Sequence, residues 1–201
     1  MVIIFAALII IVLGFYKFVF LRDPKREIPS GNNLLSPADG KIINILKLSK
    51  KEIRIAKGSG MIRALVPESC KDGWLITIMM TVFDVHVQRA PIAGEVTDIK
   101  YSKGKFKNAV YGHALENGLE NEKNEITIKS EIGDVKVIQI AGYIARRIQC
   151  FVSKKQKVNK GERIGRIVIG SQVCLIVPRK VNLAVKNGER VVAGKTIIGT
   201  I

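Results

Sequence analysis

A chain of 201 residues with 47% hydrophobic residues is long enough for one domain of moderate size plus an additional apolar segment. Its formal net charge of +16 predicts an anionic partner such as a membrane surface, an acidic substrate or nucleic acid. Aromatic residues make up only 6% and do not alternate with basic ones, so we expect no nucleic-acid partner. Three scattered cysteines without a Cys/His cluster argue against a metal site or a disulfide framework and favour a reducing compartment: Cys70, Cys150 and Cys174.

The N-terminal residues form an apolar stretch that predicts a membrane anchor over residues 1–22. Residues 2–16 carry no charge, Lys17 interrupts, and residues 18–21 continue the apolar run. As a helix, the stretch can cross a hydrocarbon core of about 30 Å if Lys17 extends its ammonium group to the interface. A signal peptide is disfavoured because no basic leader and no small-residue cleavage site are present, and a buried core helix stays open as an alternative.

Basic and loop-forming residues follow the anchor. Arg22, Lys25 and Arg26 satisfy the positive-inside rule if the body of the protein lies on the cytoplasmic side of the cell membrane. Proline, glycine and asparagine in residues 23–35 predict a linker to a β-rich catalytic domain over residues 36–201. All residues with candidate chemistry then lie downstream of the anchor, which we expect to act as a tether.

The domain is dominated by alternating and β-branched runs that Gly, Pro, Asn and Asp separate, with no amphipathic helix of normal length. We therefore predict an all-β sandwich or barrel. Residues 181–201 resemble the barrel-sandwich of biotinyl and lipoyl domains, but Lys195 lacks the flanking residues of a carrier lysine. The predicted strands cover residues 41–48, 52–57, 74–82, 95–101, 125–129, 134–144, 164–169, 173–177, 181–186 and 196–201.

A Gly-Ser pair lies inside one of the apolar runs, Arg163–Pro178. Glycine weakens a strand interior and usually marks a kink or a close backbone approach. At a kinked Gly170-Ser171 bond, the serine hydroxyl can attack the preceding carbonyl and convert the amide into an ester, and elimination then leaves a pyruvoyl group. Taken alone, Ser171 is more often an ordinary strand serine. The other pair, Gly58-Ser59, lies among polar residues and predicts a turn.

Two further segments hold side chains with possible chemistry. Asp39 ends a turn before a predicted strand, where capping is the commoner role. His86 lies in a predicted strand whose alternation places Asp84, His86 and Gln88 on one face. A lone histidine on a strand is more often structural than catalytic, so neither residue decides the function by itself.

Six motifs, taken together and in this order, are far more specific than any one of them. They resemble the short-form phosphatidylserine decarboxylases, which are made as proenzymes, and the match runs from about Phe20 to the C-terminus. The motifs are Phe20–Arg26, Ser36–Gly40, Asp84–Pro91, Asn121–Asn124, Ala145–Ile148 and Gly165–Ser171.

The resemblance implies self-cleavage at Gly170-Ser171 into a β chain of residues 1–170 and an α chain of residues 171–201. The α chain would begin with the pyruvoyl cofactor, and the two chains would remain a heterodimer, with a higher homo-oligomer left open. The pyruvoyl carbonyl would form a Schiff base with the amine of phosphatidylserine. Carbon dioxide would leave, and phosphatidylethanolamine would be the product.

Roles for individual side chains follow from that chemistry. By the logic of a Ser-His-Asp triad, His86 is the candidate base toward Ser171, and Asp39 is the candidate group that orients it. His86 is also the candidate proton donor to the product. Candidates for binding a phosphate or carboxylate of the substrate are Arg89, Arg146 and Arg147.

The chain also departs from the family pattern. The differences are at Gln88, Lys123, Gln172 and Cys174, and Arg89 stands where longer members carry a second histidine. An alternative function is a membrane-tethered basic β-domain that binds anionic lipid or nucleic acid without chemistry. A pyruvoyl decarboxylase acting on a soluble amino acid is disfavoured by the anchor.

Overall fold

The computed structural model describes residues 1–48, 72–103, 122–141, 147–168 and 171–201, so the predicted strand over 52–57 lies outside the described ranges. A helix, α1 (Val2–Phe15), continues into one widened π-helical turn, η1 (Tyr16–Phe20). The strands are β1 Asn33–Leu35, β2 Gly40–Leu48, β3 Gly73–Met80, β4 Val87–Arg89, β5 Gly94–Ser102, β6 Lys123–Ser130, β7 Gly133–Ala141, β8 Arg147–Cys150, β9 Lys157–Val158, β10 Arg163–Val168, β11 Ser171–Pro178, β12 Asn182–Leu183, β13 Arg190–Val191 and β14 Ile197–Thr200.

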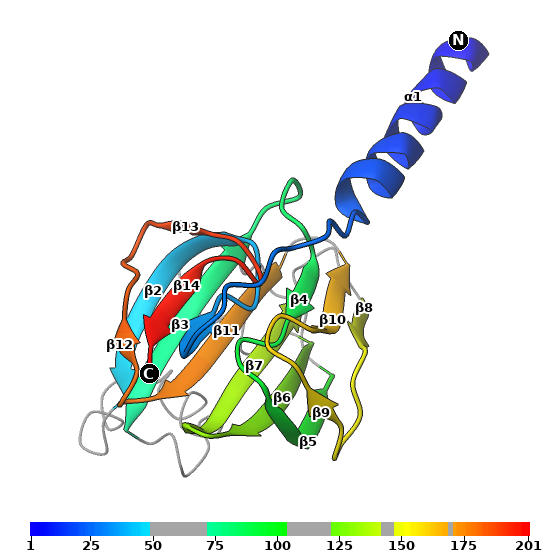
Figure 1. The fold of residues 1–201 in the computed structure, drawn as a ribbon. Helices are drawn as coiled ribbons and strands as arrows, with labels where there is room; N and C mark the ends of the chain where they lie inside the picture. Colours follow the sequence, from blue (N-terminus) through cyan, green and yellow to red (C-terminus); the bar gives the residue numbers. More distant parts are fainter. Residues whose placement is uncertain (49–71, 104–121, 142–146, 169–170) are drawn as a thin grey trace.

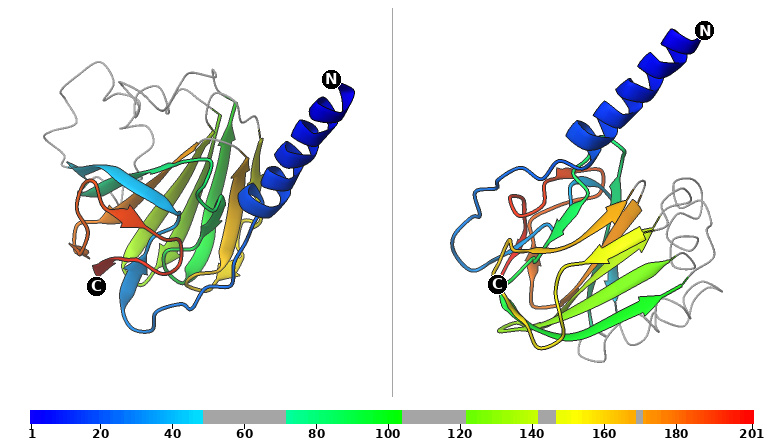
Figure 2. Two further views of the ribbon diagram at one scale, coloured as in Figure 1. Left: turned by 90° about the horizontal axis from the view of Figure 1, so that it is seen from above. Right: turned by 90° about the vertical axis from the view of Figure 1, so that its right-hand side faces the viewer.

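These strands form one large antiparallel sheet and two small ones (Figure 1). The large sheet has the order β13-β2-β3-β11-β7-β6-β5-β9 and curls into half a barrel (Figure 2). The small sheets, β1-β14-β12 and β4-β10-β8, contribute Leu34, Ile164, Ile167 and Ile198 to the same hydrophobic cluster as the large sheet. All three sheets therefore enclose one core.

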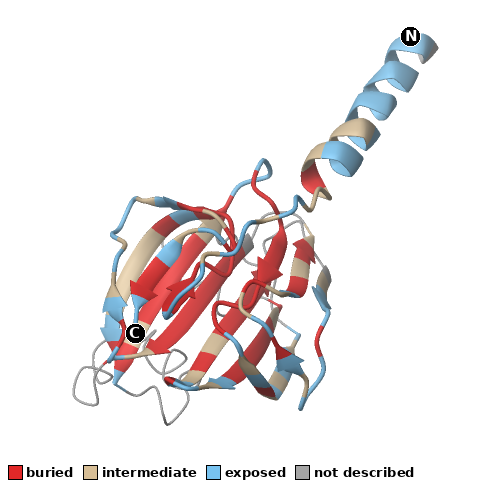
Figure 3. Cartoon of the chain, in the orientation of Figure 1, coloured by how far each residue is buried: buried red, intermediate tan, exposed pale blue. Residues whose placement is uncertain are grey.

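β11 lies in the middle of the large sheet, and its sequence explains that place. It pairs with β3 over its whole length and with β7 over most of it. Val173, Leu175 and Val177 belong to the main core, whereas Cys174 and Ile176 pack in a second cluster on the opposite face. A strand buried on both faces (Figure 3) shows a continuous apolar run in place of alternation.

β10 and β11 are consecutive in the chain but belong to different sheets. β10 pairs with β4 and β8, whereas β11 enters the large sheet at Ser171. Ser171, the second residue of the predicted cleavage site, is therefore the first residue of the large sheet after the chain leaves β10.

α1 and η1 form an apolar arm that projects from the β-domain (Figures 1 and 2). The 18 residues Ile3–Phe20 have a mean hydropathy of 2.7, and most of their side chains are exposed. At 1.5 Å per residue they span about 27 Å, which is close to the thickness of the hydrocarbon core. By length and composition, this is the one helix in the described part of the chain that could cross a membrane.

The predicted all-β domain with one N-terminal helix is confirmed. The long predicted strands are present, but the run over 181–186 shrinks to the two residues of β12. The strands that the sequence did not predict are two to four residues long, too short to show a period. One of them, β1, lies within residues 23–35, where we expected a linker, and pairs with β14. The segment after the arm is thus partly built into the domain.

Candidate active site

His86 directly precedes β4, which pairs with β10 in one of the small sheets. From β10 the chain continues to β11 in the large sheet. The predicted strand around His86 is shorter than expected, since β4 covers only Val87–Arg89. The carbonyl of His86 accepts a hydrogen bond from the amide of Ile167 at 3.1 Å. Ile167 lies three residues before Gly170, and three residues of extended chain reach at most about 10 Å. The backbone of His86 is therefore paired with a residue only three positions before Gly170 in the chain.

The imidazole of His86 has the protonation state of a base. Its Nδ1 lies 2.8 Å from the main-chain carbonyl oxygen of Asp84. A carbonyl can only accept, so Nδ1 carries the hydrogen and Nε2 presents its lone pair. Nε2 is buried and has no hydrogen-bond partner among the described residues. This unprotonated nitrogen is what a general base requires.

The end of the apolar arm covers this imidazole. The ring of Phe20 lies over that of His86 with the centroids 4.1 Å apart, and Tyr16 stacks on Phe20 at 5.7 Å. Phe20 is 2% exposed and His86 is fully buried. The last turn of the arm is therefore one wall of the site.

Burial keeps His86 neutral. The pKa of His86 is lowered from 6.5 to about 4, mainly by loss of hydration, and the charges of Arg22 and Arg166 contribute to this lowering. The hydrogen bond to the Asp84 carbonyl and the Asp84 charge act in the opposite direction but do not compensate. At neutral pH, Nε2 is thus free to accept a proton.

Asp84 is itself held from two sides. Its Oδ2 accepts hydrogen bonds from the amide and the hydroxyl of Thr81, both at 2.7 Å. Its Oδ1 pairs with Arg190 of β13. The carboxylate is 5% exposed, so these contacts fix the loop whose carbonyl orients His86.

A chain of buried amides supports the backbone of His86. Gln88 Nε2 donates to the His86 carbonyl at 2.9 Å, and Gln139 Nε2 donates to Gln88 Oε1 at 2.8 Å. Asn124 Nδ2 in turn donates to Gln139 Oε1 at 2.9 Å. Gly165 makes room for this chain, because a Cβ there would meet Gln139 Nε2 at 2.5 Å. All three amides are at most 3% exposed.

Asp39 has other partners than the expected one. Its carboxylate accepts hydrogen bonds from Arg26 Nη2 at 2.9 and 3.2 Å and from the amide of Ala193 at 2.8 Å. Within the described ranges, Asp39 and His86 share no hydrogen bond. The contact that orients the imidazole comes from the main chain of Asp84, and Asp39 instead joins the segment after the arm to the C-terminal loop.

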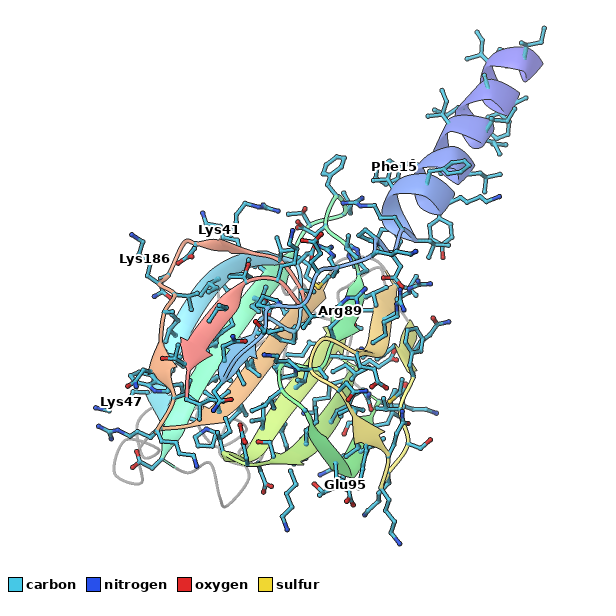
Figure 4. All side chains as sticks on the ribbon, viewed as in Figure 1. Phe15, Lys41, Lys47, Arg89, Glu95 and Lys186 are labelled. Carbon is cyan, nitrogen blue, oxygen red and sulfur yellow. The ribbon has the colours of Figure 1, made fainter. Side chains whose placement is uncertain are left out.

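Arg89 also makes structural contacts (Figure 4). Its guanidinium donates to the carbonyl of Gly161 at 3.0 Å, to Asp23 at 2.9 Å and to the carbonyl of Pro24 at 3.3 Å. Asp23 also pairs with Arg163. These contacts bind Arg89 to the segment after the arm, so its donors are already occupied by the protein.

The remaining candidates are placed by the main chain or lie outside the described ranges. Ser171 opens β11, and Arg147 opens β8 opposite Val168. Gly170 and Arg146 fall outside the described residues. Cys174 is fully buried, and burial raises the pKa of its thiol to about 11, so this departure from the family pattern adds no reactive group.

Several residues of the site were not predicted. Gln139 and Arg166 had a visible signal, since each is a lone polar side chain inside an apolar run. Phe20 and Arg22 gave no local signal, because an aromatic residue at the end of an apolar helix and an arginine after it are ordinary features of a membrane anchor. The sequence analysis thus assigned none of these four residues to the site: Phe20, Arg22, Gln139 and Arg166.

The site combines a buried neutral histidine, a serine at a crossing between two sheets and an apolar arm that covers the histidine. Such an arrangement suits an enzyme whose chemistry is shielded from water and whose apolar arm could reach a membrane. Among the described residues, no cluster of His, Cys, Asp and Glu could hold a metal ion.

Comparison with known proteins agrees with this class. A profile of the phosphatidylserine decarboxylase family matches residues 15–199. A protein of Methanosarcina barkeri named as an archaetidylserine decarboxylase proenzyme is 38% identical over 196 residues, which cover 97% of this chain and 82% of that protein. One of Methanocaldococcus jannaschii with the same name is 39% identical over 201 residues, covering 96% and 94%. A phosphatidylserine decarboxylase proenzyme of Chlorobaculum tepidum is 37% identical over 190 residues, covering 93% and 79%.

The chain therefore belongs to the phosphatidylserine decarboxylase family, and it is a decarboxylase.

The lowered pKa of His86 predicts a loss of stability in acid. The unfolded chain binds a proton on this residue below pH 6.5, but the folded chain binds it only below about pH 4. The free energy of unfolding should therefore fall by about 3 kcal/mol through this group as the pH drops across that window. Denaturant titrations of detergent-solubilised protein and of His86→Gln from pH 7 to pH 4 test this. Curves that run parallel for the two proteins would contradict it.

The amide chain predicts a large cost for Gln139→Leu. This change leaves Asn124 Nδ2 and Gln88 Oε1 buried without their partner, at roughly 1–3 kcal/mol for each group. Gln156→Leu is the matched control, because the Gln156 amide makes its hydrogen bond at the surface. Equal losses of unfolding free energy in the two variants would show that the buried chain has no special weight.

Proposed function

We propose that the chain is a proenzyme that cuts itself between Gly170 and Ser171 and then, as a pyruvoyl enzyme, converts phosphatidylserine into phosphatidylethanolamine and carbon dioxide. The observation that carries this proposal is the imidazole of His86, with a buried lone pair on Nε2. Its backbone is paired with Ile167, three residues before Gly170. The relatives named as decarboxylase proenzymes support the same reading.

The surroundings of Ser171 fit a pyruvoyl group. Ser171 is paired on both sides, with Met80 of β3 and with Ala141 of β7. A cut before Ser171 leaves the new chain end held between these two strands. The pyruvoyl group supplies an electron-withdrawing carbonyl that allows the carboxylate of an amino-acid headgroup to leave as carbon dioxide.

The described residues supply the proton transfers. His86 Nε2 takes the proton of the Ser171 hydroxyl, whose oxygen attacks the carbonyl carbon of Gly170. The proton then passes to the Ser171 nitrogen as its bond to that carbon breaks, which leaves an ester. Elimination of this ester cuts the chain, and water hydrolyses the resulting enamine to the pyruvoyl group and ammonia. The Asp84 carbonyl keeps the hydrogen of the imidazole on Nδ1, and burial under Phe20 keeps the ring neutral. Loss of the carboxylate as carbon dioxide consumes one proton, which in turnover would pass from water through Nε2 to the carbon that has lost its carboxylate.

The two products of the cut stay together as a heterodimer. The fragment of residues 171–201 contributes the central strand of the large sheet and also pairs β14 with β1. It reaches the site twice, through Arg190 to Asp84 and through the amide of Ala193 to Asp39. Separation would break a sheet at its centre.

The arm directs the enzyme toward a substrate that stays in the bilayer. Arg22, Lys25 and Arg26 follow the apolar stretch and favour the cytoplasmic side for the β-domain. The names of the relatives differ in the lipid part, phosphatidylserine or archaetidylserine, and share the serine. The serine headgroup is thus the part on which the proposed reaction acts.

Maturation tests the proposal directly. The purified protein should run as two bands on a denaturing gel, whereas Ser171→Ala should remain a single 22.2 kDa chain. The mass of the small fragment should show a pyruvoyl group in place of its first serine. One uncut band from the unchanged sequence would instead support the alternative, a non-catalytic basic domain that binds anionic lipid.

His86→Ala should slow this cleavage by roughly two to four orders of magnitude, because the hydroxyl loses its base. Asp39→Asn should slow it less, because Asp39 contacts Arg26 and Ala193 and has no hydrogen bond to His86. Gel time courses at pH 7 measure both rates. A His86→Ala protein that matures at the normal rate would remove histidine from the mechanism.

Two deletions test whether the arm only tethers the domain or also covers the active site. A form without residues 2–14 keeps η1 and should mature normally, whereas a form without residues 2–22 loses Phe20 and should mature at least about tenfold more slowly. In the full chain, Phe20→Ala should behave like the longer deletion, and Phe18→Ala, which removes an exposed ring, should not. Equal maturation rates for all four forms would mean that the arm is only a tether.

A further inference from the structure

Two arginines beside His86 differ from the others of the described ranges. Arg22 and Arg166 contact only main-chain carbonyls. The remaining arginines with described side chains are each paired with a carboxylate: Arg26, Arg89, Arg163, Arg179 and Arg190.

The two guanidinium groups converge on one place. Arg22 donates to the carbonyls of Val19 and Phe83, and Arg166 Nη2 lies 3.5 Å from the carbonyl of Leu21. Arg166 Nε is buried and has no hydrogen-bond partner in the described part of the chain. Both charges are near enough to His86 to lower its pKa. Two cations that have no counter-ion among the described residues therefore lie near His86.

This place is at the depth of lipid headgroups if the arm crosses the membrane. Arg22 comes two residues after the apolar stretch Ile3–Phe20. The loop that Arg22 contacts exposes Phe83, which is 66% exposed and packs edge-on against Phe15 at 5.8 Å. Phe15 lies near the base of the arm (Figure 4), so the apolar surface continues from the arm onto this loop. Arg22 contacts the carbonyl of Phe83 and Arg166 contacts that of Leu21, so both guanidinium groups would lie near the boundary between hydrocarbon and water.

We propose that Arg22 and Arg166 bind the phosphodiester of the phospholipid whose headgroup reacts at His86, an inference that rests on the proposed function. A phosphodiester keeps its charge throughout the reaction. The carboxylate of the headgroup, in contrast, loses its charge as carbon dioxide forms. An ion pair with that carboxylate would stabilise the ground state more than the transition state and would slow the reaction. Two arginines beside the base therefore suit the phosphate.

Arginine is the appropriate residue for this role. Its planar fork donates two parallel hydrogen bonds to phosphate oxygens, which fixes the orientation of the lipid as well as its position. In the described part of the chain, neither side chain has a carboxylate partner that the lipid would have to displace. Arg89, which we expected to bind substrate, has such a partner in Asp23.

Binding can be measured without turnover in the full-length Ser171→Ala chain. Dioctanoyl phosphatidylserine is titrated calorimetrically into the protein in a zwitterionic detergent. Arg166→Gln and Arg22→Gln should each weaken binding roughly 10- to 100-fold, as expected for lost charge-assisted hydrogen bonds. Arg179→Gln, the matched control, removes the same charge at the other end of β11 and should change binding less than about twofold. The lipid affinity of Arg166→Lys should lie between that of the chain with Arg166 and that of Arg166→Gln, since lysine keeps the charge but lacks the planar guanidinium group.

Three further ligands identify what the arginines recognise. Dioctanoylglycerol, which lacks phosphate, should bind equally to all variants. Glycerophosphoserine, which lacks the acyl chains, should bind more weakly than the lipid and should lose affinity in both glutamine variants. Inorganic phosphate that binds as tightly as the lipid would assign the site to a free anion and overturn the proposal.

The outcomes separate this inference from the proposed function. Normal lipid binding by both glutamine variants, or an equal loss in Arg179→Gln, overturns the phosphate site even if the enzyme matures and decarboxylates. If the unchanged chain never matures but binds the lipid through Arg22 and Arg166, the phosphate site stands and the proposed activity falls. If Arg166→Gln does not fold, Arg22→Gln decides alone.

Discussion

The hydrogen bond from His86 Nδ1 to the carbonyl of Asp84 is the contact on which the site depends. It fixes which ring nitrogen carries the hydrogen, and so leaves Nε2 with its lone pair. The bond requires the loop of Asp84 to stay in place, and Thr81 and Arg190 hold its carboxylate. Arg190 belongs to the C-terminal fragment. The orientation of the base is therefore set partly by the fragment that begins at the bond it is proposed to help cut.

The apolar arm has a second role beyond reaching a membrane. Its last turn buries Phe20 against the imidazole, and the segment after it is fastened by two partly buried ion pairs, Asp23 with Arg89 and Arg26 with Asp39. Pairs of this kind hold position because the loss of one partner leaves an uncompensated buried charge. The contacts that attach the arm to the domain are thus the same contacts that cover His86, which the sequence alone did not indicate.

The sequence predicted those parts of the molecule that have a local signal. Apolar and β-branched runs gave the long strands, and the motifs around Asp39, His86 and Ser171 gave the candidate chemistry. The contacts that complete the site join residues far apart in the chain, as from Arg166 to Leu21, 145 residues away. No periodicity reports such a contact. Likewise, the sequence offered two acidic residues, Asp39 and Asp84, as possible neighbours of His86. Only the three-dimensional structure shows that the main-chain carbonyl of Asp84, and not a carboxylate, orients the ring.

The charges beside His86 connect lipid binding to proton transfer. Before lipid binds, burial and the two arginines lower the pKa of the imidazole and keep it neutral, as the proposed transfer of the serine proton to Nε2 during maturation requires. A phosphodiester bound by Arg22 and Arg166 would offset their charges and raise the pKa of His86. A histidine with a higher pKa holds a proton more readily and can deliver it to the product carbon. The same side chain can then act as a base in the proenzyme and as an acid in turnover, because its electrostatic surroundings differ between the two steps.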